Sequence, residues 1–401
     1  MTIKRQPSDF QVIEHLEAAW QAKVVTEPRA FAVLRLQKEG LATPEAAVQV
    51  ARTLKCKSGA VAYAGLKDKH AQTTQHFTLR LDQIEAGALP EKLSGPGWQA
   101  ERLGYCEAPI ASDAIAANEF TIVVRGMTKE SCRDMDQAAD LLRFSPDAMR
   151  IVNYFGDQRF GSARHGQGFL AKQLIKGEFE AALKLRIATT ARKDRQSQKD
   201  VRRAIAAGWG NWKELLKQLP NCPERPCIVR LADSPKDFRG AFAALPYFEQ
   251  QLCVYAYQSH LWNATARKMV AQLCAPLGPV LAADDEYGEL LFPTVAALPP
   301  ALAHIELPLF AKQTEAVEPW KAAAEAVLAE EGLEMRDLAI PGLRRPFFGE
   351  VLRHFSVEAC NFSISAPSKD RERGGALLER TLKFKLPRGA YATVLLRALG
   401  Q

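Results

Sequence analysis

The residues best able to do chemistry lie in the stretch Gly65-Leu-Lys-Asp-Lys-His-Ala-Gln-Thr-Thr-Gln75, where Asp68 stands between Lys67 and Lys69. An aspartate has a reference pKa of about 3.9, so Asp68 is expected to be ionised near neutral pH. An ionised carboxylate can act as a nucleophile or accept a proton as a general base. A charged loop residue is more often simply solvated, so this pattern alone does not identify a catalytic aspartate.

Two predicted β-strands flank this stretch. Residues 60–64 are small and apolar, and residues 77–81 alternate between apolar and polar side chains. Strands fix the ends of a loop while its side chains stay accessible, which is why binding and catalytic groups often lie on such loops. The sequence therefore predicts that Asp68 is presented on a connection between two strands.

A strand, a helix and a further strand precede the Asp68 loop. Residues 9–14 and 31–36 alternate like strands, and Thr43-Pro44-Glu45 predicts a helix start with the Thr43 hydroxyl at the cap. The residues expected on the apolar face of this helix are Ala47, Val48, Ala51 and Leu54.

Later segments predict further elements of both types. Strand faces are expected at Phe120, Ile122 and Val124, and at Leu382, Phe384 and Leu386. Helices are expected near residues 130–145, with Leu141 and Leu142 inward, and at residues 248–276, 320–331 and 391–399. Strand patterns thus occur before residue 150 and return after residue 345, which predicts one domain interrupted by another.

Length and composition set broad limits. A chain of 401 residues is too long for one ordinary core, so two domains are expected. The net charge of +7 is compatible with a polyanionic partner without requiring one. No segment approaches about 20 uninterrupted apolar residues and no signal peptide is recognised, so a cytoplasmic protein without a membrane partner is expected.

The eight cysteines are scattered, and reduced thiols are expected. Cys222 and Cys227 have the wrong spacing for a zinc site, and we expect no metal. The most basic stretch is residues 192–203. It predicts either the solvated face of a helix or a contact with RNA phosphates.

Four motifs in the chain resemble those of the TruD family of tRNA pseudouridine synthases, in the family's order. They are Ala64 to Ala71 with Thr74-Gln75, Asn118-Glu119-Phe120-Thr121, Asn153 to Gly161, and Phe384 to Thr393. Because these motifs span most of the chain, the resemblance covers both predicted domains.

The resemblance implies a fold and a layout. The fold is α+β, a pseudouridine synthase domain with a mixed, largely antiparallel sheet, plus an inserted α/β TRUD-type domain. Residues 1–153 and 345–401 would form the catalytic domain, and residues 154–344 the insert.

The resemblance also implies the activity, an isomerase that converts uridine to pseudouridine in tRNA, with position 13 expected as the target. It needs no cofactor, and tRNA would be the partner of a monomeric protein. Asp68 matches the family's catalytic residue, and the matches to substrate-binding or neighbouring positions are Phe10, Asn118, Tyr391, Phe120 and Lys4. Tyr391 falls where the family often has phenylalanine, a mild departure because its ring can still stack.

Two other functions remain possible from the residues. A non-catalytic RNA-binding or RNA-chaperone protein could share this architecture, although it would have no use for the Asp68 carboxylate, which repels phosphate. Hydrolysis of a glycosidic bond usually requires two carboxylates at a defined separation, and the loop offers only Asp68. The sequence does not distinguish nucleophilic attack by Asp68 at ribose C1′ from removal of the 2′ proton.

Overall fold

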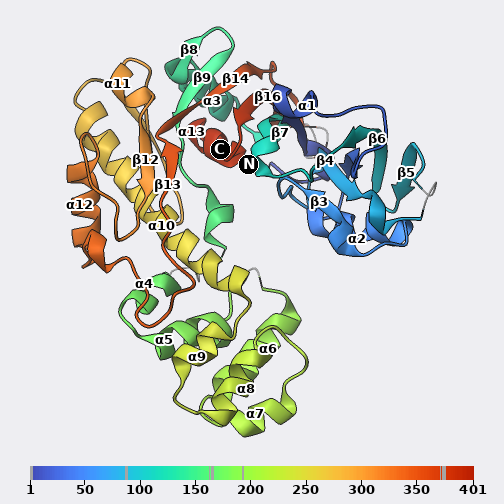
Figure 1. Cartoon of the computed structure of the whole chain (residues 1–401). Helices are drawn as coiled ribbons and strands as arrows, with labels where there is room; N and C mark the ends of the chain where they lie inside the picture. The colour runs from blue at the N-terminus through green and yellow to red at the C-terminus, as the bar shows by residue number, and fades with distance from the viewer. Residues whose placement is uncertain are drawn as a thin grey trace. The chain divides into compact units, whose positions relative to one another are not determined.

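The computed structural model describes residues 3–85, 89–161, 163, 167–191, 194–370, 372 and 376–401. The chain divides into two compact units (Figure 1). The first, here called the sheet unit, comprises Met1–Ile151 and Val357–Gln401. The second, the helical unit, comprises Val152–Ser356. The boundary between the units at residues 151–152 lies close to the predicted limit at residue 153. The second boundary, at residues 356–357, lies later than the predicted limit at residue 345.

The sheet unit is built on a twelve-stranded sheet with the main order β5-β6-β2-β4-β1-β7-β16-β14-β9-β8. Its strands are β1 (Phe10–Leu16), β2 (Phe31–Lys38), β3 (Val61–Tyr63), β4 (Gln72–Arg80), β5 (Lys92–Gly95), β6 (Trp98–Cys106), β7 (Ile115–Met127), β8 (Arg143–Ser145), β9 (Ala148–Val152), β14 (Ser356–Ile364), β15 (Ser368–Lys369) and β16 (Leu378–Pro387). Strand β1 pairs with β4 in parallel, whereas β7 pairs with β1 and β16 antiparallel. The sheet is therefore mixed, as expected for this fold class.

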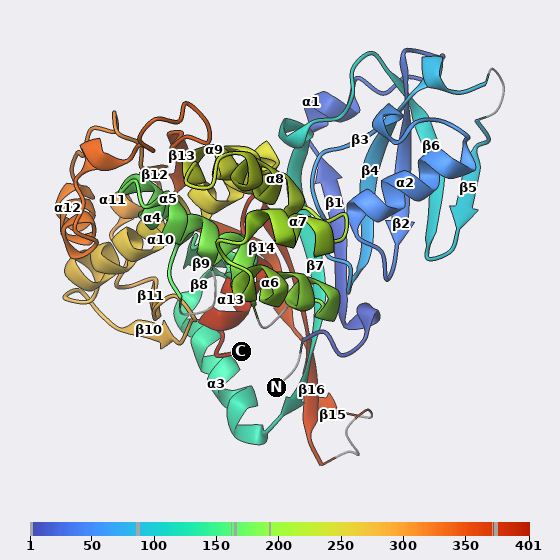
Figure 2. The ribbon, with the colours of Figure 1, turned by 90° about the horizontal axis from the view of Figure 1, so that it is seen from below.

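The helices of the sheet unit are α1 (Ala18–Gln21), α2 (Thr43–Thr53), α3 (Lys129–Leu142) and α13 (Ala392–Ala398). Helix α2 lies across one face of β2 and β4 (Figure 2). The alternation of β2 places Leu34 and Leu36 on that face, where they join Phe77 and Leu79 of β4 in a buried core. Burying these large apolar side chains fixes which face of the sheet α2 covers.

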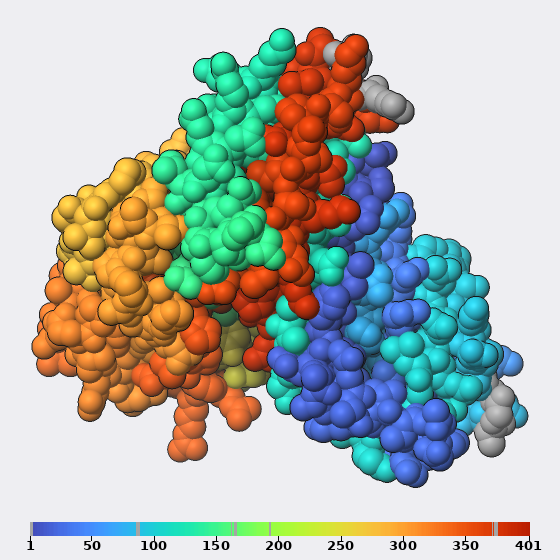
Figure 3. Space-filling model, turned by 90° about the horizontal axis from the view of Figure 1, so that it is seen from above, coloured from blue at the N-terminus to red at the C-terminus, as the bar shows by residue number. Residues whose placement is uncertain are grey.

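The C-terminal part of the chain returns to the same sheet. Strand β16 pairs with β7 over Leu378↔Met127 to Pro387↔Ala117, and the two segments lie side by side in red and blue-green (Figure 3). The predicted inward residues are buried as expected: Phe120, Ile122 and Val124 in β7, and Leu382, Phe384 and Leu386 in β16. The sheet is thus shared by residues from both ends of the chain.

Three local predictions were wrong. Val48 is 36% exposed, and the core side of α2 is instead completed by Ala46 and Val50, which are fully buried. Leu141 is 40% exposed, since only Leu142 of the pair points into the core from α3. Strand β4 begins at Gln72 rather than at residue 77, so the connection carrying Asp68 is residues 64–71. The first residues of β4 are Gln and Thr, so the strand begins without the apolar–polar alternation that would have revealed it.

The helical unit is dominated by helices and contains two small antiparallel sheets. Its helices are α4 (Leu170–Ile175), α5 (Phe179–Leu183), α6 (Gln196–Ala207), α7 (Trp212–Gln218), α8 (Arg225–Asp233), α9 (Phe238–Ala243), α10 (Tyr247–Met269), α11 (Pro300–Ala303) and α12 (Lys321–Glu330). Strands β10 (Val280–Ala283) and β11 (Leu290–Pro293) form one pair, and β12 (Glu306–Leu309) and β13 (Val351–His354) form the other.

The long helix α10 is the centre of the helical unit. It buries Val254, Tyr257, Leu261 and Trp262, all fully inaccessible to solvent. The predicted helix at 248–276 is confirmed, since α10 continues as a turn of π-helix through Val270–Cys274. The predicted helix at 320–331 is confirmed as α12. In the described part of the chain, no helix is both long and apolar enough to cross a membrane.

The basic stretch at 192–203 was predicted to be either a solvated helix face or an RNA contact, and Arg202 fits neither prediction. Arg192 and Lys193 lie outside the described residues, Asp194 and Arg195 precede α6, and residues 196–203 form its start. Arg202 is only 4% exposed and is ion-paired with Asp194, so it belongs to the interior and not to a solvated or RNA-facing surface. Helical periodicity turns Arg202 inward while Arg203 remains outside.

Candidate active site

A buried lysine of β2 forms hydrogen bonds with the backbone of the Asp68 loop. Lys38, at the end of β2, is 3% exposed, and its Nζ donates to the carbonyl oxygens of Leu41 at 2.8 Å and Asp68 at 2.9 Å. Burial lowers the pKa of Lys38 to about 8, despite the nearby negative charge of Asp68. Lys38 therefore acts on the Asp68 loop through backbone carbonyl oxygens and not through the Asp68 carboxylate.

The start of helix α2 supplies a second anchor. The Thr43 hydroxyl accepts a hydrogen bond from the backbone N–H of Lys67 at 2.9 Å and donates to Gln75 Oε1 at 3.0 Å. The prediction that Thr43 caps the helix was therefore wrong. The N-cap is Ala42, whose backbone N–H donates to Glu45 at 2.9 Å. Thr43, which is fully buried, instead joins the loop to β4.

The two lysines beside Asp68 pair with different carboxylates. Lys67 Nζ lies 2.8 Å from Glu14 Oε2, and the two side chains are 8% and 1% exposed. Lys67 Nζ also donates to Asn118 Oδ1 at 2.6 Å. Lys69 pairs with Glu45 at 3.0 Å, with both side chains 42% exposed. One neighbour of Asp68 thus enters a buried network, and the other stays in a solvated ion pair.

Glu14 occupies a gap in the strand pairing. Strand β1 pairs with β4 only as far as Ile13↔Thr74, and β3 pairs with β4 from Tyr63↔Phe77 onwards. Between them, the backbone N–H of His76 donates to Glu14 Oε1 at 2.9 Å. Burial raises the pKa of Glu14, but hydrogen bonds from His76 and the charge of Lys67 outweigh it, so the pKa lies below its ordinary value. Glu14 is therefore a buried anion.

Lys4 lies at the Asp68 carboxylate. Its Nζ forms an ion pair with Asp68 Oδ2, with 24% and 34% of the two side chains exposed, and sits 4.1 Å from the centroid of the Phe10 ring. Asp9, between Lys4 and Phe10 in the chain, is buried against Arg125 with Nη2 to Oδ1 at 2.8 Å. The segment that follows Lys4 is therefore anchored at Asp9.

The predicted aromatic residues form a row. The Phe10 and Phe120 rings contact edge to face at 6.1 Å, and Phe120 stacks on Phe384 at 5.3 Å. Phe10 and Phe120 are 4% and 7% exposed. In this structure both rings pack in the core of the sheet unit, and Phe10 supports Lys4.

Tyr391 is the predicted site residue nearest the end of the chain. It is half-buried at the N-cap of α13, beyond the end of β16. The end of β16 places Leu386 opposite Asn118, and the backbone N–H of Arg388 donates to Ala116 at 3.2 Å. The segment leading to Tyr391 therefore runs beside the strand that carries Asn118.

Sequence reasoning missed Glu14, Lys38 and Thr43 as parts of this site. A usable signal exists for the first two. Phe10, Val12 and Glu14 alternate inward along β1, as do Leu34, Leu36 and Lys38 along β2. A charged residue in phase with buried apolar ones must find a partner inside the protein. Thr43 gave no comparable signal, since its bonds depend on the folded loop.

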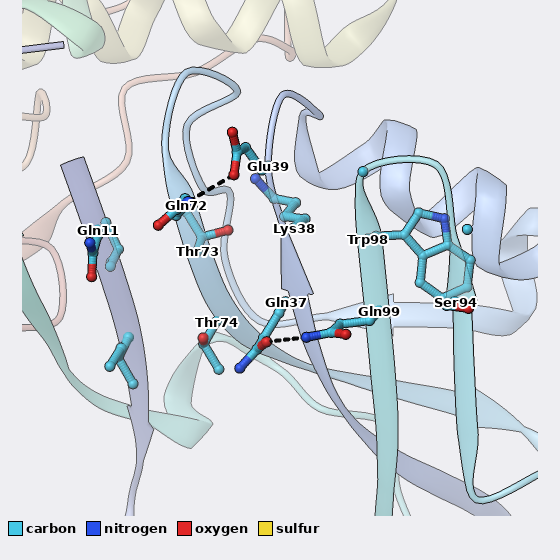
Figure 4. Close-up of a pocket in the computed structure, with 14 residues that line it drawn as sticks. Gln11, Gln37, Lys38, Glu39, Gln72, Thr73, Thr74, Ser94, Trp98 and Gln99 are labelled. Carbon is cyan, nitrogen blue, oxygen red and sulfur yellow. Dashed lines mark hydrogen bonds between the residues drawn. The ribbon is translucent and has the colours of Figure 1, made fainter. Parts of the chain in front are cut away.

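The same sheet also carries a wide hollow of about 730 Å³, lined by polar and apolar residues that include Gln37, Gln99 and Lys38 (Figure 4). Strand register aligns Ile13, Thr74, Gln37 and Gln99 across four strands. Gln99 donates to Gln37 at 2.6 Å. Side chains alternate along each strand, so this row faces away from Glu14, Lys38 and the Asp68 loop. In the described part of the chain, no group of three or more His, Cys, Asp or Glu residues could hold a metal ion.

Comparison with known proteins gives a consistent family. The family model for tRNA pseudouridine synthase D (TruD) matches residues 1–283 and 297–399. A protein of Aquifex aeolicus named tRNA pseudouridine synthase D is 26% identical, over 99% of this chain and 97% of that protein. A protein of Methanococcus maripaludis named as a probable tRNA pseudouridine synthase D is also 26% identical, over 99% and 98% of the two chains.

A solved structure has the same fold. A crystal structure from Methanosarcina mazei, described as a TruD protein, superposes with a TM-score of 0.69 at 23% identity, covering 99% of this chain and 92% of that one. The family match spans nearly the whole sequence and includes the loop that holds Asp68. The chain therefore belongs to the TruD family of tRNA pseudouridine synthases.

Proposed function

We propose that this protein isomerises uridine to pseudouridine in tRNA, with Asp68 as the catalytic carboxylate. The observation that carries the proposal is the setting of Asp68. Its carboxylate is one-third exposed and meets Lys4, while its backbone is held by the buried Lys38. A reacting group needs both features, because the substrate must reach it and its position must not drift.

The reaction requires no net change in electrons. The bond between ribose C1′ and uracil N1 breaks, the base turns while it is held, and C5 bonds to C1′. The C5 hydrogen leaves as a proton and N1 gains one. Asp68 can either attack C1′, to be displaced later by C5, or remove the 2′ proton. Both routes use the ionised carboxylate.

Lys4 could act at two stages of this reaction. While Asp68 is negatively charged, the Lys4 ammonium compensates that charge. When the carboxylate bonds to C1′ or gains a proton, its charge is lost and the uracil carries negative charge instead. The Lys4 ammonium is then positioned to stabilise the detached base, provided the base lies within hydrogen-bonding reach.

The remaining predicted site residues are assigned to holding the base. Asn118 is fixed by Lys67 through its Oδ1, which leaves its amide N–H groups for a uracil carbonyl. Tyr391 offers a half-buried ring on which an extruded base could stack. Phe10 and Phe120 would act mainly by supporting Lys4 and the strands beneath the base.

The wider assignments belong to the same proposal. The sheet unit would be the catalytic domain and the helical unit the inserted one. Position 13 of tRNA is the expected target, the cytoplasm the expected compartment, and a monomer the expected form. A tRNA substrate agrees with the net charge of +7.

The test is pseudouridine mapping on unmodified tRNA by carbodiimide labelling and primer extension, with native protein and Asp68→Asn. We expect a stop at one uridine with the native protein and none with the variant. If neither protein modified any tRNA while both bound it, the non-catalytic RNA-binding function would replace this proposal.

A further inference from the structure

The helical unit carries a group of exposed aromatic and arginine side chains that the proposed reaction does not use. Tyr247 and Phe248, in the first turn of α10, are 44% and 66% exposed, and Phe347 is 52% exposed. Arg344 and Arg345 precede Phe347 in the segment that connects α12 to β13 (Figure 1). We call Tyr247, Phe248, Arg344, Arg345 and Phe347 the aromatic–arginine patch.

Buried hydrogen bonds hold the two parts of this patch together. Gln251 is 5% exposed; its Nε2 donates to the Phe347 carbonyl at 2.9 Å, and its Oε1 accepts from the Phe347 backbone N–H at 3.2 Å. The Tyr247 hydroxyl also donates to Gln251 Oε1, at 3.2 Å. The guanidinium of Arg345 lies 5.5 Å from the centroid of the Tyr247 ring. The Tyr247 side chain and the Phe347 backbone are therefore held together by Gln251.

The charge around the patch is positive. In the described parts of the chain, neither Arg344 nor Arg345 forms an ion pair. The nearby carboxylate of Glu249 is occupied by Arg186, and that of Glu350 accepts from Thr314. A third arginine, Arg239, packs against the backbone of Gly342. Arg239 acts electrostatically on the Asp237 carboxylate, whereas Arg344 and Arg345 are the arginines placed to meet an anionic partner.

We infer that the aromatic–arginine patch binds unpaired nucleotides of the RNA substrate, with bases stacked on Phe248 and Phe347 and phosphates on Arg344 and Arg345. Exposed rings interleaved with cations fit single-stranded RNA, because every base has a face to stack and every link carries a charge. Protein interfaces are also enriched in aromatic and arginine side chains, but their cores are depleted of charge, whereas here a guanidinium lies over an exposed ring. The inference rests on the proposed function for the identity of the RNA.

The experiment measures the affinity of unmodified tRNA at several salt concentrations, together with KM and the single-turnover rate of modification. Phe248→Ala should weaken binding about tenfold with little change in salt dependence, because it removes stacking. The double change Arg344→Ser and Arg345→Ser should lower the slope of log affinity against log salt by about 1.5, because it removes phosphate contacts. In both variants KM should rise while the rate at saturating tRNA stays the same.

Leu277→Ala is the matched control, since Leu277 is 60% exposed and lies elsewhere in the helical unit. Cross-linking of tRNA containing 4-thiouridine to the native protein gives a second readout, with adducts expected on the peptides containing residues 247–248 or 347. Unchanged affinity in the patch variants, or cross-links only elsewhere, would overturn the inference and point to a protein partner for the patch. If the patch variants bound tRNA more weakly but the native protein modified no tRNA, the proposed reaction would be refuted and the patch supported.

Discussion

The two faces of the sheet in the sheet unit differ in how their polar groups are held. On one face, the side chains of Glu14, Lys38 and Lys67 are buried. Lys38 of β2 bonds to the Asp68 backbone, and Lys67 of the loop pairs with Glu14 of β1. On the other, Gln37 and Gln99 line an open hollow of about 730 Å³ and bond mainly to each other. Buried polar groups that bond to one another hold their positions, so this difference favours the first face for the proposed chemistry, whatever the size of the hollow on the other.

Beyond Asp68 itself, the largest effect is expected from Lys67→Met. The change leaves the Glu14 carboxylate, which is 1% exposed, without its cation, and it releases Asn118. Breaking a buried ion pair typically costs about 3–5 kcal/mol of the free energy of unfolding. A shift of the loop should also slow modification about a hundredfold. Urea unfolding and single-turnover assays at a temperature where the variant stays folded measure the two effects.

Lys69→Met is the control for Lys67→Met, because it flanks Asp68 on the other side and its partner Glu45 is exposed. An exposed ion pair contributes about 1 kcal/mol or less. If the two variants lost stability and activity equally, the distinction between a buried and a solvated neighbour of Asp68 would be wrong.

A smaller effect is expected from Lys38→Met, and it should depend on pH. In the folded protein burial lowers the pKa of Lys38 from 10.5 to about 8. Between these values the unfolded chain keeps the proton and the folded chain does not, so raising the pH removes a cost of folding. The free energy of unfolding of the native protein, relative to Lys38→Met, should rise by up to about 3 kcal/mol from pH 8 to pH 10.5.

Taking the difference between the two proteins cancels the groups that titrate in both. Denaturant unfolding across this pH range gives the comparison. A difference that stays constant, or falls as the pH rises, would show that Lys38 is not a desolvated ammonium beneath the loop.

The smallest effect is expected on the open face. Gln37→Ala and Gln99→Ala each remove one member of an exposed amide pair. Surface changes of this kind usually alter the free energy of unfolding by about 0.5 kcal/mol or less. Modification of tRNA should not change. A marked loss of activity in either variant would show that the hollow in Figure 4 takes part in the reaction.

Much of the sheet unit could be predicted from local patterns. Alternation identified the strands that bury Phe120, Ile122, Val124, Leu382, Phe384 and Leu386, and the motif around Asp68 located the loop. The start of β4 was missed because Gln72 and Thr74 are polar on the open face and conceal the strand. Leu141 was misassigned because adjacent helical residues point in different directions.

The interior of the site could be predicted less well. No spacing in the sequence indicates that Lys67 turns to Glu14 and Lys69 to Glu45, since these contacts join segments far apart in the chain. The pairing of Lys4 with Asp68 depends on Asp9, which is held by Arg125. Such arrangements follow from the tertiary fold, which brings the partners together only after the strands have paired.

The most direct test of the catalytic role of Asp68 compares single-turnover modification of tRNA by the native protein and Asp68→Asn, with RNA affinity measured on the same samples. The substitution keeps the size of the side chain and removes its charge. We predict that the rate falls by about 10³-fold or more while affinity is retained, because only the reacting group has been lost. A variant that retained a rate within about tenfold of the native protein would contradict the assignment, because Asp68 would then supply less than about 1.4 kcal/mol to the transition state.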